Sequence, residues 1–298
     1  MTSVLYDVPG PRAKARNLIL NVVGVVIAAA IVWFVYARFA RDPQGPATSQ
    51  WDSAKWKPFV QADTWTNFLL PGIGGTLKAA AVAAVLAVVF GLVFGVGRMS
   101  TVRPVSWLCA AVIEFFRAVP LLLMMVFLYL APTTIFHRPA NVFLAVVVAL
   151  MLYNGSVLAE VIRAGVQSLP RGQSEAGMAI GLTPGQSMRI VLLPQAIRAM
   201  LPAIIAQLVV LLKDSALGYI IGYGELLRQA TLLGTNSGTS NTVPALIVVA
   251  AIFIAMNLAL GALAQWVESW TRRRGHTAGD VRGRGPVAPT PDAGVGHV

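Results

Sequence analysis

The sequence is poor in charged residues and holds a single cysteine. Only 12% of its 298 residues are Asp, Glu, Lys or Arg, against roughly 25% in a soluble domain, and 56% are hydrophobic. Such a chain cannot cover a surface that faces water, and its mean hydropathy of +0.70 predicts an integral membrane protein. The lone Cys109 excludes a disulfide within the chain and leaves the redox compartment undetermined.

Signatures of metal binding, nucleotide hydrolysis and nucleophilic catalysis are also missing. The three histidines, His137, His276 and His297, lie far apart without metal-ligand spacing, so no metal site is expected. The stretch "GLTPGQS" at 181–187 imitates a phosphate-binding loop, but its glycines are too close and Gln186 replaces the lysine. We therefore expect no catalytic residue and no cofactor in this chain, which argues against an intramembrane enzyme.

The net charge of +11 would suggest a nucleic-acid partner in a soluble protein. Here most of the cations stand at the ends of apolar runs, where Lys and Arg set the orientation of a membrane protein. The charge pattern therefore indicates a lipid bilayer and no nucleic acid as the partner.

Six apolar runs approach or exceed the roughly 20 residues that a spanning helix needs. They lie at 18–39, 72–97, 105–131, 141–162, 195–213 and 243–270. The first run is longer than the ~7–15 apolar residues of a signal-peptide core, so a retained anchor is favoured over a cleaved signal. The predicted fold is an all-α membrane protein of six spans, with Pro120 and Pro202 as sites of local kinks and Gly91 and Gly95 as a close-packing step.

Lys and Arg are unevenly shared between alternate loops, which predicts the orientation. The richer set holds Arg12, Lys14, Arg16, Arg98, Arg103, Arg171, Arg189, Arg272, Arg273 and Arg274. The poorer set holds Arg41, Lys55, Lys57, Arg138 and Arg228, accompanied by several acids. Both termini and the stretch 163–194 are therefore expected in the cytoplasm.

Two segments are then expected outside. The linker 41–66 carries Trp51, Trp56 and Trp65, which we expect at the level of the lipid headgroups. The segment 214–242 contains the apolar piece "ALGYIIGYGELL", which is too short to span and predicts a re-entrant or surface helix.

A polar stretch, "GQSEAGMAIGLTPGQSMRIVLLPQ" at 172–195, interrupts this apolar chain. Pro170 and Gly172 are expected to end the fourth span and to leave a short helix over about 173–180. Gly181 suits the left-handed turn that ends such a helix.

A second short helix is expected directly after that turn. Thr183 can cap it with Pro184 at its first position, and Met188, Val191 and Leu192 give it an apolar face. Pro194 is expected to break or kink it before the membrane. The result is a helix–turn–helix knob on the cytoplasmic side, which is either a loop without a partner or a shape that fills a groove in a second protein.

This stretch resembles the EAA loop of bacterial ABC-importer permeases. That pattern reads Glu-Ala-Ala, three residues, Gly, nine residues, Ile, any residue, Leu-Pro. The matching positions are Glu175, Ala176, Gly177, Gly181, Val191, Leu193 and Pro194. Gly177 replaces the second Ala and Val191 replaces Ile, and neither change removes the turn glycine.

The flanks resemble the polar-amino-acid branch of that family, most of all its glutamate-uptake permeases. The similar stretches are "EFFRAVPLLL" at 114–123, "LAEVIRAGVQSLPRGQSEA" at 158–176, "LLPQAIRAMLPAI" at 192–204 and "LLKDSALGYIIGYGEL" at 211–226. The resemblance implies a five-helix permease domain over 67–271. It leaves outside a cytoplasmic N-terminus at 1–17, an extra helix with its linker at 18–66 and a basic disordered tail at 272–298.

The resemblance also implies the function and the partners. It describes the transmembrane subunit of an ATP-driven importer for polar amino acids, in the bacterial cell membrane. The implied partners are two ATPase subunits that use ATP and Mg, a second identical or sister permease and an external amino-acid-binding protein. Glutamine, aspartate and arginine remain open beside glutamate. A secondary transporter would instead show inverted repeats, which the sequence lacks.

Ionisable residues within the spans are costly and are therefore functional candidates. Glu114 and Arg117 share a helix face and lie roughly 13 Å from the cytoplasmic start of their span, at ~1.5 Å per residue. Glu160 and Arg163 repeat this spacing nearer the cytoplasmic surface and are expected to neutralise each other. For Glu114 with Arg117 two interpretations stay open: mutual neutralisation, or binding of the ammonium and carboxylate of an amino acid.

Three further charges lie toward the external ends of the spans. Lys78 is in the external half of the second span, and Lys213 and Asp214 end the fifth. The two lysines favour an acidic substrate, whereas a basic substrate would use Asp214 together with the glutamates. The expected substrate path therefore comprises Glu114, Arg117, Lys78, Lys213 and Asp214.

Overall fold

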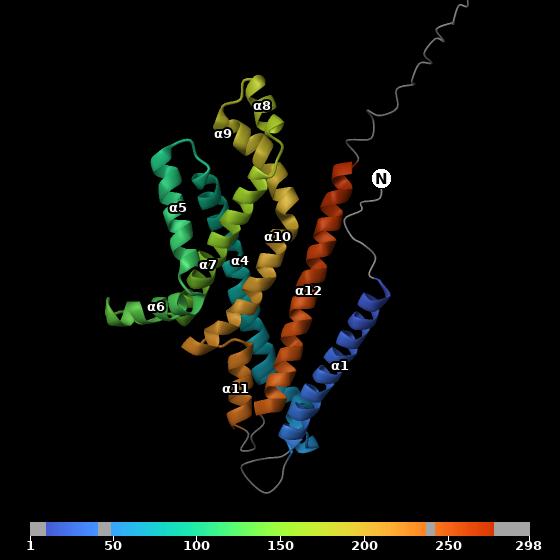
Figure 1. The fold of residues 1–298 in the computed structure, drawn as a ribbon. Helices are drawn as coiled ribbons and strands as arrows, with labels where there is room; N and C mark the ends of the chain where they lie inside the picture. Colours follow the sequence, from blue (N-terminus) through green and yellow to red (C-terminus); the bar gives the residue numbers. More distant parts are fainter. Residues whose placement is uncertain (1–9, 41–48, 237–241, 277–298) are drawn as a thin grey trace, which may run out of the picture. The chain divides into compact units, whose positions relative to one another are not determined.

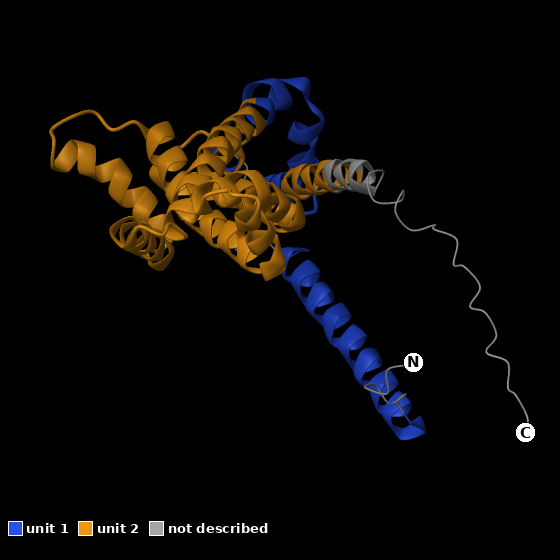
Figure 2. Ribbon diagram, turned by 90° about the horizontal axis from the view of Figure 1, so that it is seen from above, with its two compact units in different colours: residues 1–70, 229–250 blue, residues 71–228, 251–298 orange. Residues whose placement is uncertain are grey.

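The computed structural model describes residues 10–40, 49–236 and 242–276, and every regular element within these ranges is a helix (Figure 1). The chain divides into two compact units, residues 1–70 with 229–250 and residues 71–228 with 251–298 (Figure 2). The all-α fold predicted from the sequence is thereby confirmed for the described residues. Most of the tail expected at 272–298 lies outside them, although α12 (Thr242–His276) continues as a helix through its first residues.

Five helices of the described chain are long and apolar enough to cross a membrane. They are Pro11–Ala40, Ala62–Arg98, Val142–Gln167, Pro184–Ile221 and Thr242–Trp266. These coincide, apart from a few residues at the ends, with the predicted first, second, fourth, fifth and sixth spans. The predicted kink at Pro202 falls inside a helix that continues to Asp214.

The third predicted span, 105–131, is wrong as one continuous helix. It consists of α5 (Arg103–Ala118) and α6 (Leu121–Thr134), which meet at an angle of 98° (Figure 1). Val119 is extended, with ψ 126°, because the ring of Pro120 disfavours the helical conformation in the residue before it. Pro120 was expected to kink this span, and it ends the helix instead. The pair makes a sixth, broken span if it is counted as one.

The first unit carries a chain of stacked aromatic rings. Tyr36 of α1 (Pro11–Ala40) stacks on Trp51, and Trp51 stacks on Trp56, with ring centroids 5.3 and 6.3 Å apart. The indole N–H of Trp51 also donates to the Tyr36 carbonyl at 3.2 Å, and that of Trp65 donates to the Phe59 carbonyl at 2.8 Å. These contacts order the described part of the linker. Its place at the headgroups stays a prediction.

The second unit is built around α7 (Val142–Gln167), whose buried face is rich in small residues. α4 (Leu70–Arg98) packs against it through Gly91 and Gly95. A Cβ at Gly91 would lie 2.8 Å from the Leu158 Cβ, and one at Gly95 would lie 2.9 Å from the Ala159 carbonyl oxygen. This confirms the expected packing step. Close backbone contact of this kind stabilises helix pairs in lipid, where apolar side chains gain nothing by leaving the solvent.

Gly95→Ala should therefore destabilise the protein, because the new methyl group meets backbone atoms that cannot move away. Overpacking of this kind costs about 1–3 kcal/mol, offset in part by the better helix propensity of Ala. Gly74→Ala is the matched control, since a Cβ at Gly74 of the same helix meets nothing within 4 Å. The melting temperature in detergent measures both variants. A melting temperature of Gly95→Ala at or above that of Gly74→Ala would contradict this packing.

Candidate functional site

The polar stretch forms two short helices beyond the end of α7. α8 (Arg171–Ala179) is followed by Gly181 in the left-handed conformation, with φ +88°, and then by α9 (Pro184–Gln186) (Figure 1). The Gly181 and Leu182 N–H groups donate to the Met178 and Gly177 carbonyls at 2.9 and 3.1 Å, which is a Schellman end. The predicted helix–turn–helix is therefore confirmed, with its first helix beginning at Arg171.

The second helix begins with a capping box. The Thr183 backbone N–H donates to Gln186 Oε1 at 2.9 Å, and the Gln186 N–H donates to Thr183 Oγ1 at 3.4 Å. The expected break at Pro194 is wrong, because the helix passes through it into α10 (Leu193–Asp214). A wide π-helical turn at Ser187–Leu192 precedes α10, and Pro194 stands in the first turn after it, where its missing N–H is least costly.

The replacement of the second Ala of the pattern by Gly177 has a local reason. Gly177 is buried, and a Cβ there would lie 2.8 Å from Ser187 Oγ of the π-helical turn. α8 therefore packs directly on the segment that leads into α10. Gly177 and Ser187 fit together as a pair.

Apolar side chains project from this otherwise polar loop. Met178, Ile180 and Ile190 are 49%, 78% and 62% exposed, and Glu175 and Ala176 beside them are exposed as well. Large apolar residues that gather on a surface mark a site of interaction with another protein or with the membrane. The loop thus has a fixed conformation and an apolar surface.

The loop is also joined firmly to the two spans that flank it. Gln207 Nε2 of α10 donates to Asn154 Oδ1 of α7 at 2.8 Å, near the middle of both helices. Nearer the loop, a Cβ at Gly165 would lie 3.3 Å from the Ala196 carbonyl oxygen. Within the loop region, Gln195 Nε2 donates to Gln173 Oε1 at 3.1 Å. Contacts at three levels therefore hold α7, the loop and α10 together.

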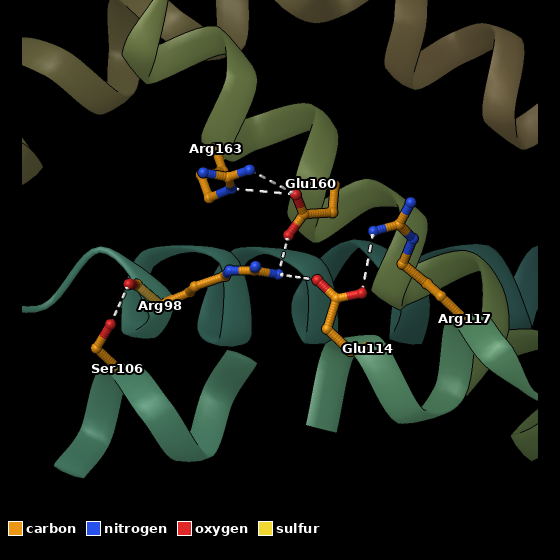
Figure 3. A network of polar contacts seen from close by, with 6 residues as sticks. All are labelled: Arg98, Ser106, Glu114, Arg117, Glu160 and Arg163. Atoms are coloured by element: carbon orange, nitrogen blue, oxygen red, sulfur yellow. Dashed lines mark hydrogen bonds and ion pairs between the residues drawn. The ribbon is translucent and has the colours of Figure 1, made fainter. Parts of the chain in front are cut away.

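An ion network lies where α4, α5 and α7 meet (Figure 3). Arg98, the last residue of α4, bonds through Nη1 to Glu114 Oε1 at 3.0 Å and to Glu160 Oε1. Arg163 Nη2 lies 3.0 Å from Glu160 Oε2, whereas Arg117 Nη1 lies 3.9 Å from Glu114 Oε2, too far for a hydrogen bond. One guanidinium thus joins carboxylates from two other helices.

This network brings together two glutamates that were expected apart. Glu160 was expected nearer the cytoplasmic surface than Glu114, yet both bind the same Arg98. Their depth in the membrane stays a prediction. The expected pairing of Glu160 with Arg163 is confirmed. Arg98 was assigned to a loop, since no spacing rule connects it with residues 16 and 62 positions away.

The other charges of the expected substrate path lie apart from this network. Lys78 Nζ stands 5.1 Å from the centroid of the Phe143 ring, a cation–π contact. Lys213 is exposed and Asp214 half-buried at the far end of α10. Within the described chain, none of the three makes an ion pair with the network. The structure therefore brings together only Glu114 and Arg117 of that set.

The segment after α10 folds back onto α4. The short helix Ser215–Ile221 continues α10, Gly222 turns with φ +81°, and α11 (Leu226–Asn236) follows. The Tyr223 hydroxyl donates to the Gly75 carbonyl at 2.9 Å, and the Leu226 N–H donates to Thr76 Oγ1 at 3.1 Å. The expected surface or re-entrant helix is thus a helix–turn–helix clamped to one end of α4.

Glu225 is fully buried in this clamp. Its carboxylate accepts hydrogen bonds from the Leu227 and Arg228 N–H groups at 2.7 and 2.6 Å and so caps α11. Burial raises the pKa of Glu225 to about 7, although the two backbone hydrogen bonds act to lower it. Sequence reasoning gave Glu225 no role, because nothing in its neighbours marks it as buried.

The comparisons with known proteins agree with this geometry. The family of binding-protein-dependent transport system inner membrane components matches residues 87–273. This chain belongs to that family. The matched region contains both the loop and the ion network, and α1 precedes it.

Several relatives are transport permeases for amino acids. The glutamate transport system permease protein GluD of Corynebacterium glutamicum is 48% identical over 225 residues, 75% of this chain and 82% of that protein. The glutamate/aspartate import permease protein GltK of Escherichia coli is 35% identical, over 58% of this chain and 80% of its own. The arginine transport system permease protein ArtQ of Bacillus subtilis is 34% identical, over 67% and 91%.

Solved structures give the same family. An amino acid ABC transporter crystallised with histidines matches with a TM-score of 0.65 and 32% identity, over 72% of this permease and 97% of that chain. The methionine transporter MetNI, at 23% identity and a TM-score of 0.56, supports the fold alone. The resemblance to amino-acid ABC permeases, stated from the sequence, is thus confirmed.

Glu225 makes the stability of this permease depend on pH. Its pKa is raised from 4.5 to about 7, so the folded state holds a proton that the unfolded chain releases. The resulting stability, about 3 kcal/mol, is fully present below the unfolded pKa and is lost as pH rises through the folded one. The melting temperature of the wild type should fall between about pH 5 and about pH 8, and Glu225→Gln should remove this part of the fall.

Glu175→Gln is the control for that measurement, because Glu175 is exposed. It should keep the pH dependence of the wild type. An unchanged pH dependence in Glu225→Gln would show that the carboxyl is not protonated in the folded state.

Proposed function

We propose that this chain is the membrane-spanning subunit of an ATP-driven importer for polar amino acids, with glutamate as the leading substrate. The observation that carries the proposal is the loop between α7 and α10, with its fixed turn at Gly181 and exposed Met178, Ile180 and Ile190. The 48% identity to a glutamate permease supports the choice of substrate.

In this proposal the loop docks into a separate ATPase subunit. Glu175 and Ala176 belong to the docking face, Gly177 and Gly181 set its shape, and Leu193 and Pro194 lead into the membrane. Two ATPase subunits bind ATP and Mg and supply the hydrolysis. Because α7, the loop and α10 are held together at three levels, a movement of the loop is carried into the membrane.

The remaining partners follow from the same proposal. The permease domain, 67–271, pairs with an identical or sister permease, and the helix and linker of 18–66 are an addition to it. Both termini face the cytoplasm in the bacterial cell membrane, and an external binding protein delivers the amino acid. Closure of the ATPase pair then switches the two permeases between inward-open and outward-open states.

The substrate path is proposed to pass the exposed edge of the ion network. Arg117 has no hydrogen bond from the network, and its side chain is 40% exposed, so it is free to receive a substrate carboxylate. Glu114, 58% exposed, can accept the ammonium group. Lys78, Lys213 and Asp214 would lie farther along the path. Glutamine, aspartate and arginine are the alternatives that competition assays distinguish.

Gly181→Arg should abolish ATPase docking without preventing membrane insertion. An arginine at φ +88° is strained, and its side chain enters the docking face. Gly181→Asn is the matched control, since Asn tolerates the left-handed conformation. Purification from native membranes in mild detergent should recover an ATPase with the wild type and with Gly181→Asn only.

Normal uptake by Gly181→Arg would exclude this role for the loop. Failure to recover any ATPase with a folded, monodisperse wild-type sample would instead favour a secondary transporter.

Arg117→Ala should raise the KM for glutamate roughly 10- to 100-fold, the effect of losing a hydrogen bond to a charged group. Arg117→Lys keeps the charge and should recover part of the affinity. Uptake of labelled glutamate into proteoliposomes measures both variants. Unchanged glutamate transport in Arg117→Ala would remove Arg117 from the substrate path.

A further inference from the structure

Arg98 bonds to two carboxylates that lie on different helices, one near the proposed substrate contact and one on the helix that leads into the loop. Glu114 lies on α5, beside the proposed substrate contact Arg117, and Glu160 lies on α7. α7 ends at Gln167, seven residues beyond Glu160, and leads directly into the loop. Among the described side chains, Arg98 alone bonds to both glutamates (Figure 3).

The two carboxylates depend on Arg98 to different degrees. Glu160 keeps a second hydrogen-bonded partner, Arg163, on its other oxygen. Glu114 has only the distant Arg117 besides Arg98, and its side chain is 58% exposed. Loss of Arg98 would therefore leave Glu160 in place and release Glu114.

Arg98 itself is fixed at its backbone. The Ser106 hydroxyl donates to the Arg98 carbonyl at 2.6 Å, across the turn between α4 and α5. The Arg98 side chain is 20% exposed and that of Glu160 is 18% exposed, so this ion pair is poorly screened by solvent. The contacts of α4 with α7 at Gly91 and Gly95 do not involve it.

We propose that Arg98 is a positioning residue that couples Glu114 and Arg117 on α5 to the end of α7 that leads into the docking loop. The inference rests on the proposed function. When the ATPase displaces α7, Glu160 moves with it, and the ion pairs of Arg98 shift the position of Glu114. In the opposite direction, substrate binding at Glu114 changes the position of α7 through the same two ion pairs.

The test uses the complete transporter in proteoliposomes with its ATPase and the external binding protein. ATP hydrolysis is measured without and with glutamate-loaded binding protein, together with glutamate uptake. Arg98→Gln should assemble and keep its basal hydrolysis, but its stimulation by glutamate should fall about tenfold or more, as expected for the loss of a charged hydrogen bond. Arg98→Lys, which keeps the charge without the planar fork, should recover part of it.

Two further variants decide what Arg98 does. Arg163→Gln removes the same charge from the network without touching Glu114 and should keep the stimulation. Glu160→Gln breaks the other end of the bridge and should lose it, and the double variant with Arg98→Gln should be no worse than either single variant. The comparison of Glu160→Gln with Arg163→Gln holds even if Arg98→Gln fails to fold.

Full stimulation in Arg98→Gln or in Glu160→Gln would overturn the proposal. So would an equal loss in Arg163→Gln, because net charge rather than the bridge would then explain the effect. Failure of the proposed function gives a different result, since the wild-type transporter itself would then show no glutamate-stimulated hydrolysis.

Discussion

The second unit depends on how α7 is held without a hydrophobic force between helices. In lipid, apolar side chains gain little by leaving the solvent, so close contact and paired polar groups carry the association. α7 uses both: Leu158 and Ala159 lie against the glycines of α4, and Asn154 is hydrogen-bonded to Gln207 of α10. The sides of α7 are therefore fixed by different interactions, and these set which helices move together.

The contacts on the α10 side are short-range and rigid. A buried amide pair and a glycine against backbone leave little freedom, so the loop between α7 and α10 inherits the orientation of both helices. The contact with α5 combines direct packing with an ionic bridge through the long side chain of Arg98. A packed interface deforms in discrete steps, whereas a bridge through a long side chain depends on two charged contacts. The contact of α7 with α10 and its contact with α5 are thus built from different interactions.

Local rules predicted the loop well because its conformation is decided within a few residues. The left-handed turn favours a glycine, Gly181, and the free N–H groups at the start of a helix favour a capping residue, Thr183. Both preferences act whichever way the rest of the chain folds. The positions of five spans followed from composition, because a run of about 20 apolar residues is itself a local feature. The break at Pro120 was visible as a kink, but the 98° turn depends on what surrounds α6 and has no sequence signal.

The functional charges were harder to place from the sequence. The spacing of Glu114 and Arg117 placed them on one helix face and left open whether they neutralise each other or bind an amino acid. Their actual separation of 3.9 Å reflects competition from Arg98, which approaches from another helix. The burial of Glu225 could not be predicted from its neighbours either, because it arises from α4 and from the turn at Gly222. Long-range partners decide these positions.

The placement of the arginines explains how the network tolerates an excess of positive charge. Arg98, Arg117 and Arg163 face only two glutamates, which leaves a formal charge of +1. Arg98 ends α4 and Arg117 stands in the last turn of α5, so both lie at helix C-termini. The partial negative charge of a helix C-terminus stabilises a nearby cation. The helix ends thus stabilise this cationic edge, and under the proposed function an acidic amino acid meets a net positive charge there.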